Sequence, residues 1–172
     1  MKQRVNIWLK RIVGLVLLLL LTGGWLVLNA RPAWGQVGKI NYALTDLQER
    51  NFSGQNLERG VFAGADLRRA NFAGANLRAS ILTKAIFLDA NLTGVDLTET
   101  FGDRVDFSGA NLSNAIFTDA MLTSSHFFDA TITGADFSGA ILDRYQVSLM
   151  CERAEGINPT TGIATRASLG CR

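Results

Sequence analysis

The chain has 172 residues, with 17 Lys and Arg against 15 Asp and Glu and a formal net charge of +2 at pH 7. Five of the basic residues lie before residue 36, so the remaining roughly 137 residues carry 12 basic and 15 acidic side chains, a net charge of −3. The basic balance therefore belongs to the N-terminal segment and does not indicate a nucleic-acid-binding domain. The remainder is long enough for one domain with a continuous core.

The first 35 residues have the layout of a secretory signal peptide, with a basic start, an apolar stretch at residues 12–28 and a small-residue site at residues 33–35. The competing interpretation is an uncleaved membrane anchor. The seventeen residues of the apolar stretch, interrupted by Thr22, Gly23 and Gly24, fall just short of the length that spans a bilayer. We therefore expect cleavage before Gln36, export of the mature chain, and membrane contact only through this segment.

The next hundred residues carry a repeat of five. A large apolar side chain, the centre of each unit, falls on every fifth residue from Leu47 to Leu97 and from Phe107 to Leu142, and only Gly102 breaks the series. Ala often stands two positions before a centre, and Asn or Asp often stands one position before it. A period of five fits neither a helix nor a strand. It fits a coil that turns a corner every five residues, with the small and large residues inward and about twenty residues per turn.

The units AGADLRRANFAGANL at residues 63–77 and FSGANLSNAIFTDAM at residues 107–121 resemble the pentapeptide repeat family. This resemblance implies an all-β solenoid, a right-handed quadrilateral β-helix. We expect about five coils of it over residues 36–144.

Residues 145–172 depart from the repeat. Residues at helical spacing predict a helix that is stopped by Gly156 and Asn158-Pro159, and Thr165 is placed to cap a second short helix that ends at Gly170. We expect this segment to cover the open apolar end of the coils, which would otherwise offer unpaired strand edges to other molecules. The helical spacing is set by Val147, Met150, Cys151 and Ala154.

Cys151 and Cys171 both follow the repeats. In an exported protein an even pair favours a disulfide, which would stabilise the fold by about 3 kcal/mol on the chain-entropy model. Two buried free thiols are the alternative. Two cysteines and the distant His126 do not supply the four ligands of a structural zinc site, so we expect no metal and no cofactor.

Two segments are similar in sequence to the thylakoid lumenal pentapeptide proteins of cyanobacteria and chloroplasts. They are the C-terminal run CERAEGINPTTGIATRASLGC and the run INYALTDLQERNFSGQNL at residues 40–57. This resemblance implies a location in the thylakoid lumen and a helical cap bracketed by a disulfide. The periplasm is the alternative compartment for an exported chain. The resemblance does not point to any established biochemical activity.

Residues twenty apart stack into columns, and the residue before each centre gives four of them. Three columns hold mostly Asn and Asp, whose side chains can hydrogen-bond the nearby backbone or pair up the stack. The fourth, here named the apolar column, contains Val61, Ile81, Phe101, Met121 and Ile141.

Two interpretations of the apolar column stay open. It is either a docking surface for a partner or ordinary local packing. In the second interpretation Phe101 swings inward to replace the side chain that Gly102 lacks, and Gly102 marks a bulge or a tight approach.

The sequence predicts a non-catalytic scaffold or protein-interaction module, with an unidentified protein partner such as a complex of the thylakoid membrane. One alternative is a DNA mimic that inhibits DNA gyrase, as some members of the family do. Residues 45–144 hold 13 acidic and 8 basic side chains, a small surplus for such a mimic. The other alternative is a small enzyme that uses His126, one coil above Asp106, although no nucleophile is identifiable beside it.

A basic group lies in the early coils and is partly balanced by nearby acidic residues. We interpret it as a solvated face rather than a nucleic-acid site. The basic residues are Arg59, Arg68, Arg69, Arg78 and Lys84, and the acidic ones are Glu49, Glu58 and Asp89.

Overall fold

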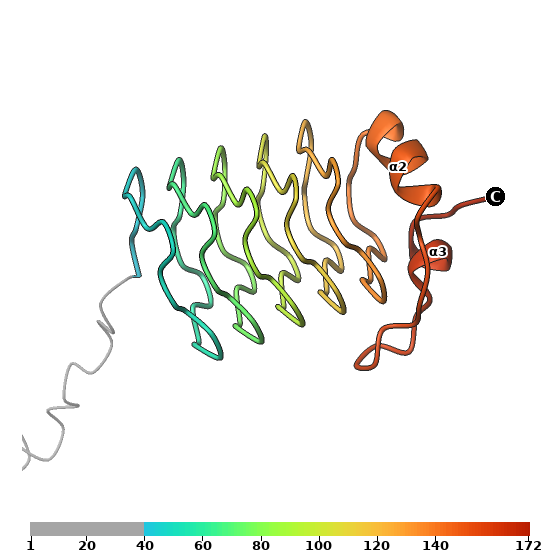
Figure 1. Cartoon of the computed structure of the whole chain (residues 1–172), viewed down its shortest axis with the longest axis horizontal. Coiled ribbons are helices and arrows are strands. Elements are labelled where there is room, and N and C mark those ends of the chain that lie inside the picture. The colour runs from blue at the N-terminus through green and yellow to red at the C-terminus, as the bar shows by residue number, and fades with distance from the viewer. Residues whose placement is uncertain (1–39) are drawn as a thin grey trace, which may run out of the picture. The chain divides into compact units, whose positions relative to one another are not determined.

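The computed structural model describes residues 40–172. They form a stack of coils followed by two short helices (Figure 1). The predicted leader, residues 1–35, lies outside the described residues. Within residues 40–172, no helix has the length and apolar character needed to cross a membrane.

Parallel bridges between residues twenty apart hold the coils together, from Asn41 with Val61 to Met121 with Ile141. Each five-residue side contributes one bridge, so four sides make one turn of the coil. The hydrogen bonds run both ways between neighbouring coils. Leu67 N–H donates to the Ile86 carbonyl at 2.8 Å, and Ile86 N–H donates to the Ala65 carbonyl at 3.0 Å.

Each corner is a tight turn that follows a centre. Ala70 N–H donates to the Leu67 carbonyl at 3.1 Å and closes one such corner. The residue two positions after the centre takes a positive φ, which is 66° at Gly74 and 57° at Arg69. Glycine adopts this conformation at little cost, while other residues adopt it with some strain. A corner every five residues therefore limits each strand to a single bridge.

The core runs along the axis of the coils, and the inward and outward assignment made from the sequence is confirmed. Ala85 and Phe87, a small residue and the next centre, are both 0% exposed. Phenylalanine rings stack from coil to coil, as between Phe117 and Phe137, whose centroids lie 4.9 Å apart. Burial of each such side chain stabilises by about 1.5 to 3 kcal/mol. The fully buried rings are Phe62, Phe72, Phe87, Phe107, Phe117, Phe127 and Phe137.

Gly102 is a tight approach and not a bulge. The bridges of Phe101 with Ile81 and with Met121 keep the regular register. A Cβ at Gly102 would lie 2.8 Å from Leu122 Cδ2 and 3.2 Å from Val105 Cγ2, so these two side chains fill the missing place. Phe101 remains 51% exposed. The prediction that Phe101 swings inward is therefore wrong, because the core has no space left for it.

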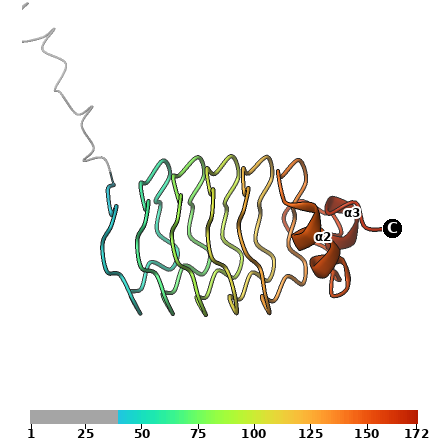
Figure 2. The same cartoon turned by 90° about the horizontal axis from the view of Figure 1, so that it is seen from above.

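Helix α2 spans Arg144–Cys151 and helix α3 spans Thr165–Ser168. Figure 2 shows both at the C-terminal end of the stack. Helix α2 ends before Gly156, so Ala154 lies beyond it although it is buried. The predicted role of Thr165 as a cap is wrong, because the N-cap is Ala164 and Thr165 is the first helical residue.

Side chains and backbone of the C-terminal segment satisfy polar groups that the last coil would leave unpaired. Phe127 N–H donates to Gln146 Oε1 at 3.0 Å, and Phe137 N–H donates to Ser168 Oγ at 3.0 Å. Gly134 N–H donates to the Glu155 carbonyl at 2.9 Å. Unpaired backbone groups at a sheet edge invite further strand pairing, and these three hydrogen bonds pair such groups at the C-terminal end of the coils.

Cys151 at the end of α2 is bonded to Cys171, with the two Cα atoms 5.6 Å apart. The disulfide joins the C-terminus to the end of α2 across 20 positions of sequence. The chain beyond α3 is thereby held against the rest of the cap.

Candidate functional site

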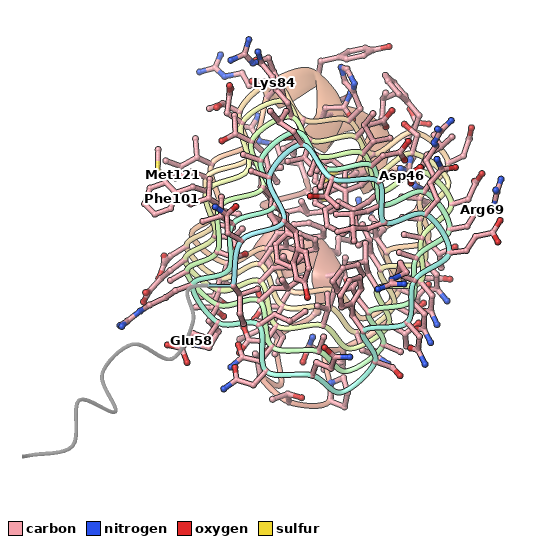
Figure 3. The ribbon with its side chains drawn as sticks, turned by 90° about the vertical axis from the view of Figure 1, so that its left-hand side faces the viewer. Asp46, Glu58, Arg69, Lys84, Phe101 and Met121 are labelled. Atoms are coloured by element: carbon pink, nitrogen blue, oxygen red, sulfur yellow. A yellow bond between two sulfur atoms is a disulfide. The ribbon has the colours of Figure 1, made fainter. Side chains whose placement is uncertain are left out.

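The apolar column lies on the outer surface of one side of the solenoid. Ile81 is 40% exposed, Phe101 51%, Met121 43% and Ile141 51%, while Val61 is partly buried. Figure 3 shows Phe101 and Met121 projecting from the same side of the coils. Consecutive bridges link all five positions, and at about 4.8 Å per coil they extend over about 20 Å.

The repeat register forces these side chains outward. Neighbouring residues of a strand point to opposite faces, so an inward Leu82 requires an outward Ile81. Nothing in the fold requires an apolar residue there, because the three other columns carry mainly polar ones.

In those columns the same position has a local structural role. Ser53 N–H donates to Asn51 Oδ1 at 3.0 Å, and Arg78 N–H donates to Asn76 Oδ1 at 3.0 Å. Asn71 Nδ2 also donates to Asn51 Oδ1 at 3.2 Å, so the asparagines pair up the stack as expected. An apolar residue cannot make these bonds. The residues of the apolar column therefore lack the hydrogen bond that Asn makes to the backbone of the turn. Local stability does not explain why apolar residues occupy this column.

Opposite charges border the middle of the apolar column. Lys84 and Arg104 occupy the corner that follows it, and Glu99 and Asp119 occupy the corner that precedes it. All four are exposed. Arg104 Nε donates to Asp103 Oδ2 at 2.7 Å, and this hydrogen bond is the main reason that the pKa of Asp103 lies below its ordinary value.

His126 does not form a dyad with Asp106. The two residues are bridged through their backbones, but the His126 ring stacks on Phe128 with centroids 5.5 Å apart. Asp106 Oδ1 accepts the Ser108 N–H at 3.0 Å instead. Over residues 40–172, no cluster of His, Cys, Asp and Glu could hold a metal ion.

The four arginines of the basic group in the early coils are paired with acidic side chains. Arg69 lies 2.7 Å from Glu49, and Arg68 lies 2.6 Å from Asp66. The hydrogen bond from Arg68 is the largest influence on Asp66 and lowers the pKa of its carboxyl group. These pairs are partly solvent-exposed and contribute little stability each.

The family model for pentapeptide repeats matches eight copies in this chain, over residues 45–99 and 103–144, which is more than half of its length. The chain belongs to the pentapeptide repeat family. Its coils are accordingly those of a right-handed quadrilateral β-helix.

Several solved structures of pentapeptide repeat proteins are similar to the chain. One from the Arabidopsis thaliana thylakoid lumen is 38% identical, covers 84% of this chain and 97% of its own, and gives a TM-score of 0.49. HetL, involved in heterocyst differentiation regulation in the cyanobacterium Nostoc, is 27% identical, with coverage of 59% and 48% and a TM-score of 0.57. Rfr23 of the cyanobacterium Cyanothece is 26% identical, with coverage of 58% and 88% and a TM-score of 0.54. No curated protein sequence matches the chain.

The sequence reasoning located the apolar column but missed its charged borders. Stacking the second residue after each centre, twenty positions apart, would have placed Lys84 beside Arg104 and Glu99 beside Asp119. It also missed Asn158, which is fully buried and holds the cap to the coils. The sequence pattern indicated Asn158-Pro159 only as a helix stop. The carbonyl groups that Asn158 contacts lie more than 40 residues away in the chain, so no local pattern reveals them.

Proposed function

We propose that this protein is a non-catalytic scaffold that binds a protein partner through the apolar column. The observation that carries the proposal is the line of four large apolar side chains, each at least 40% exposed, on successive coils. Contiguous exposed apolar surface of this kind marks interaction sites. Burial of one such side chain in a partner contributes about 1.5 to 3 kcal/mol.

The scaffold is a rigid rod of about five coils, closed at its C-terminal end by a disulfide-linked helical cap. Three observations support its location in the thylakoid lumen. The leader has the layout of a signal peptide, the two cysteines are disulfide-bonded, and the amino-acid sequence of the cap resembles that of lumenal members of the family. A complex of the thylakoid membrane is then the class of partner that we propose, and the membrane itself is contacted only through the N-terminal segment.

The two alternative functions have less support. A DNA mimic needs a strongly acidic rod, whereas several acidic side chains here are paired with arginines, as Asp66 is with Arg68 and Glu49 with Arg69. An enzyme based on His126 would need an acid, base or nucleophile positioned by it. The His126 ring packs on Phe128, and the Asp106 carboxylate accepts a hydrogen bond from the backbone of its own turn.

The experiment replaces the outward apolar residues by the residue that the repeat itself uses at that position. Ile81→Asn with Met121→Asn keeps the register, because Asn71 and Asn91 occupy equivalent positions. Ile81→Lys with Met121→Lys is the stronger perturbation. Proximity labelling and pull-down from native membranes should lose the partner in both double variants, with the melting temperature nearly unchanged.

The control is Ile86→Asn, the same replacement at the equivalent position on another side of the solenoid, where Ile86 is also exposed; it should retain the partner. Retained association in the Ile81 and Met121 variants would contradict the proposal. A collapse of stability in the Asn variant would show instead that these side chains are ordinary packing.

A further inference from the structure

We propose that the N-terminal end of the coils is a strand edge that fits a second copy of this chain head to head, and that Arg50 and Gln55 keep the two copies apart. The proposal goes beyond the scaffold function and uses other residues, so either can fail without the other. Figure 3 looks along the stack from this end.

The residue before each centre directs both of its backbone groups toward the preceding coil. Asn71 N–H donates to the Arg50 carbonyl at 2.9 Å, and the Asn71 carbonyl accepts the Phe52 N–H at 2.7 Å. In the first coil the equivalent positions, here named the edge residues, are Asp46, Asn51 and Asn56. Within residues 40–172, no backbone group pairs with the N–H or the carbonyl of any edge residue. The described part of the chain therefore begins with an open strand edge.

Such an edge is complementary to itself. In an antiparallel pair, two opposed residues exchange both of their hydrogen bonds, so each must direct its N–H and its carbonyl to the same side. Turning one stack over onto another reverses its strands, so two N-terminal ends meet antiparallel. The end is also a ramp that rises by about 4.8 Å in one turn. A two-fold rotation keeps the hand of the ramp, so two facing ramps stay at one spacing around all four sides.

The C-terminal end of another copy is not an equivalent partner. At that end the N–H groups of Phe127, Gly134 and Phe137 already donate to residues of the cap. A head-to-tail stack would have to displace these hydrogen bonds. Two N-terminal ends can pair without disturbing either cap, and they form a closed dimer with two-fold symmetry.

The length of the mature chain also favours a second copy over the chain's own N-terminus. On the expected cleavage before Gln36, only residues 36–39 precede the described part. Four residues extend to about 14 Å at most, whereas one coil takes twenty residues over four sides. The remaining sides of the edge are then left for another molecule.

The first coil departs from the later ones at the inward position two residues before each centre. Later coils carry a small residue there, most often alanine, and Ala70 and Ala75 are at most 1% exposed. Three sides of the first coil carry exposed polar residues instead, Thr45, Arg50 and Gln55. The coil encloses this position on its sides, so these side chains reach solvent at the open end.

Hydrogen bonds place two of these side chains on the edge itself. Gln55 Nε2 donates to the Asn51 carbonyl at 3.4 Å, and Thr45 Oγ1 donates to the Ala43 carbonyl at 3.2 Å. In later coils, the carbonyls at these two positions accept an N–H from the preceding coil. Gln55 therefore occupies an acceptor that a second copy would need.

Arg50 adds a charge that stacking would bury. No ion pair within residues 40–172 includes Arg50. A head-to-head pair would enclose two Arg50 side chains, one from each copy, between the two first coils. Burial of a charge without a partner is strongly unfavourable. Inward-pointing charges are one means by which proteins prevent the pairing of strand edges.

The test restores the residue that the repeat itself uses at these positions. Arg50→Ala with Gln55→Ala matches Ala70 and Ala75 of the next coil, so the fold should be kept. In sedimentation equilibrium of the protein isolated from its compartment, the mass of this variant should approach twice that of the parent as the concentration rises. NMR hydrogen exchange of the edge-residue amides should slow by at least about tenfold with the same concentration dependence.

Two control variants separate the inward positions from the rest of the first coil. Arg59→Ala with Gln48→Ala makes the same two replacements at outward positions. Arg50→Lys with Gln55→Glu keeps long polar side chains at the inward positions. Both variants should retain the mass of the parent and the fast exchange of its edge-residue amides.

The alanine variant contradicts the proposal if its mass stays at that of the parent, or if the mass rises while the edge-residue amides stay unprotected. Edge-residue amides that are already protected in the parent would also overturn it, because the edge would then be occupied with Arg50 and Gln55 in place. If the double variant melts below the parent, Arg50→Ala alone should show the same changes more weakly. The effect of the Ile81 and Met121 variants on the native partner bears only on the scaffold function.

Discussion

Leu122 occupies the place in the core that a side chain on Gly102 would need. Its Cδ2 lies 2.8 Å from the position of a Cβ on Gly102, closer than ordinary van der Waals contact. Leu122 of the next coil therefore fills the space left by the one interruption of the repeat. Val105, which stands two positions before the centre Phe107 where most units have alanine, fills the rest.

Restoration of the repeat by Gly102→Leu should destabilise the protein. Overpacking of a filled core costs about 1 to 3 kcal/mol, which chemical denaturation would measure. The matched control is the double variant Gly102→Leu with Leu122→Ala, which should lose less free energy of unfolding than the sum of its two single variants. A Gly102→Leu protein more stable than the parent would show that a cavity exists there.

Replacement of a buried centre should be far more damaging than replacement of the next residue. Phe117 is 0% exposed and stacks on Phe137, so Phe117→Ala should lower the free energy of unfolding by about 3 to 5 kcal/mol. Thr118→Ala, on the outside, should lower it by less than about 0.5 kcal/mol. Similar losses for the two variants in the same denaturation assay would refute the inward and outward assignment.

Reduction of the Cys151–Cys171 disulfide should loosen the cap and lower the melting temperature. The loss should be about 3 kcal/mol on the chain-entropy model. The double variant Cys151→Ser with Cys171→Ser should melt like the reduced protein and should not respond to reductant. Mass spectrometry of the isolated protein should find a mass two units below the reduced form, and free thiols in that material would count against the bond.

Asn158 should be the side chain of the cap that is most sensitive to replacement. Its Nδ2 donates to the Asn114 and Ala115 carbonyls at 3.1 and 3.3 Å, and its Oδ1 accepts N–H groups of Thr160 and Thr161. Asn158→Ala leaves these buried groups without partners and should cost about 1 to 3 kcal/mol. Asn158→Asp keeps the acceptor and loses the donor. If both variants melt like the parent protein, Asn158 does not anchor the cap.

The Asp66 and Arg68 pair should respond to acid. Arg68 donates to Asp66 at 2.9 and 2.6 Å and lowers the pKa of the carboxyl group. A lowered folded-state pKa means that the pair stabilises the fold above the pKa of the unfolded chain, and that this contribution disappears as the pH falls through the folded pKa. Arg68→Gln should raise the pKa of Asp66 toward its ordinary value in an NMR titration.

The control for that titration is Arg69→Gln. Arg69 acts on Asp66 only through a weaker charge interaction, so this variant should raise the pKa less. An Asp66 pKa that is the same in all three proteins would exclude the pair as its cause. Because both side chains are partly exposed, little change in melting temperature is expected at neutral pH.

The five-residue period by itself determined the coil, its inward residues and the position of the apolar column. Each unit fixes its own corner and its own inward pair through local geometry and burial, so the pattern can be read without any distant contact. Ala85 and Phe87 belong to the core for that reason, and Ile81 is outward because Leu82 is inward.

Only the tertiary structure decided what depends on contacts between coils and across the cap. Phe101 stays exposed because Leu122, twenty residues beyond Gly102, fills the core first. Helix α2 ends at Cys151, five residues before the glycine that was expected to stop it, and Asn158 is buried because it meets carbonyls of Asn114 and Ala115. These outcomes are set by packing and hydrogen bonds between residues far apart in the chain, which no local pattern encodes.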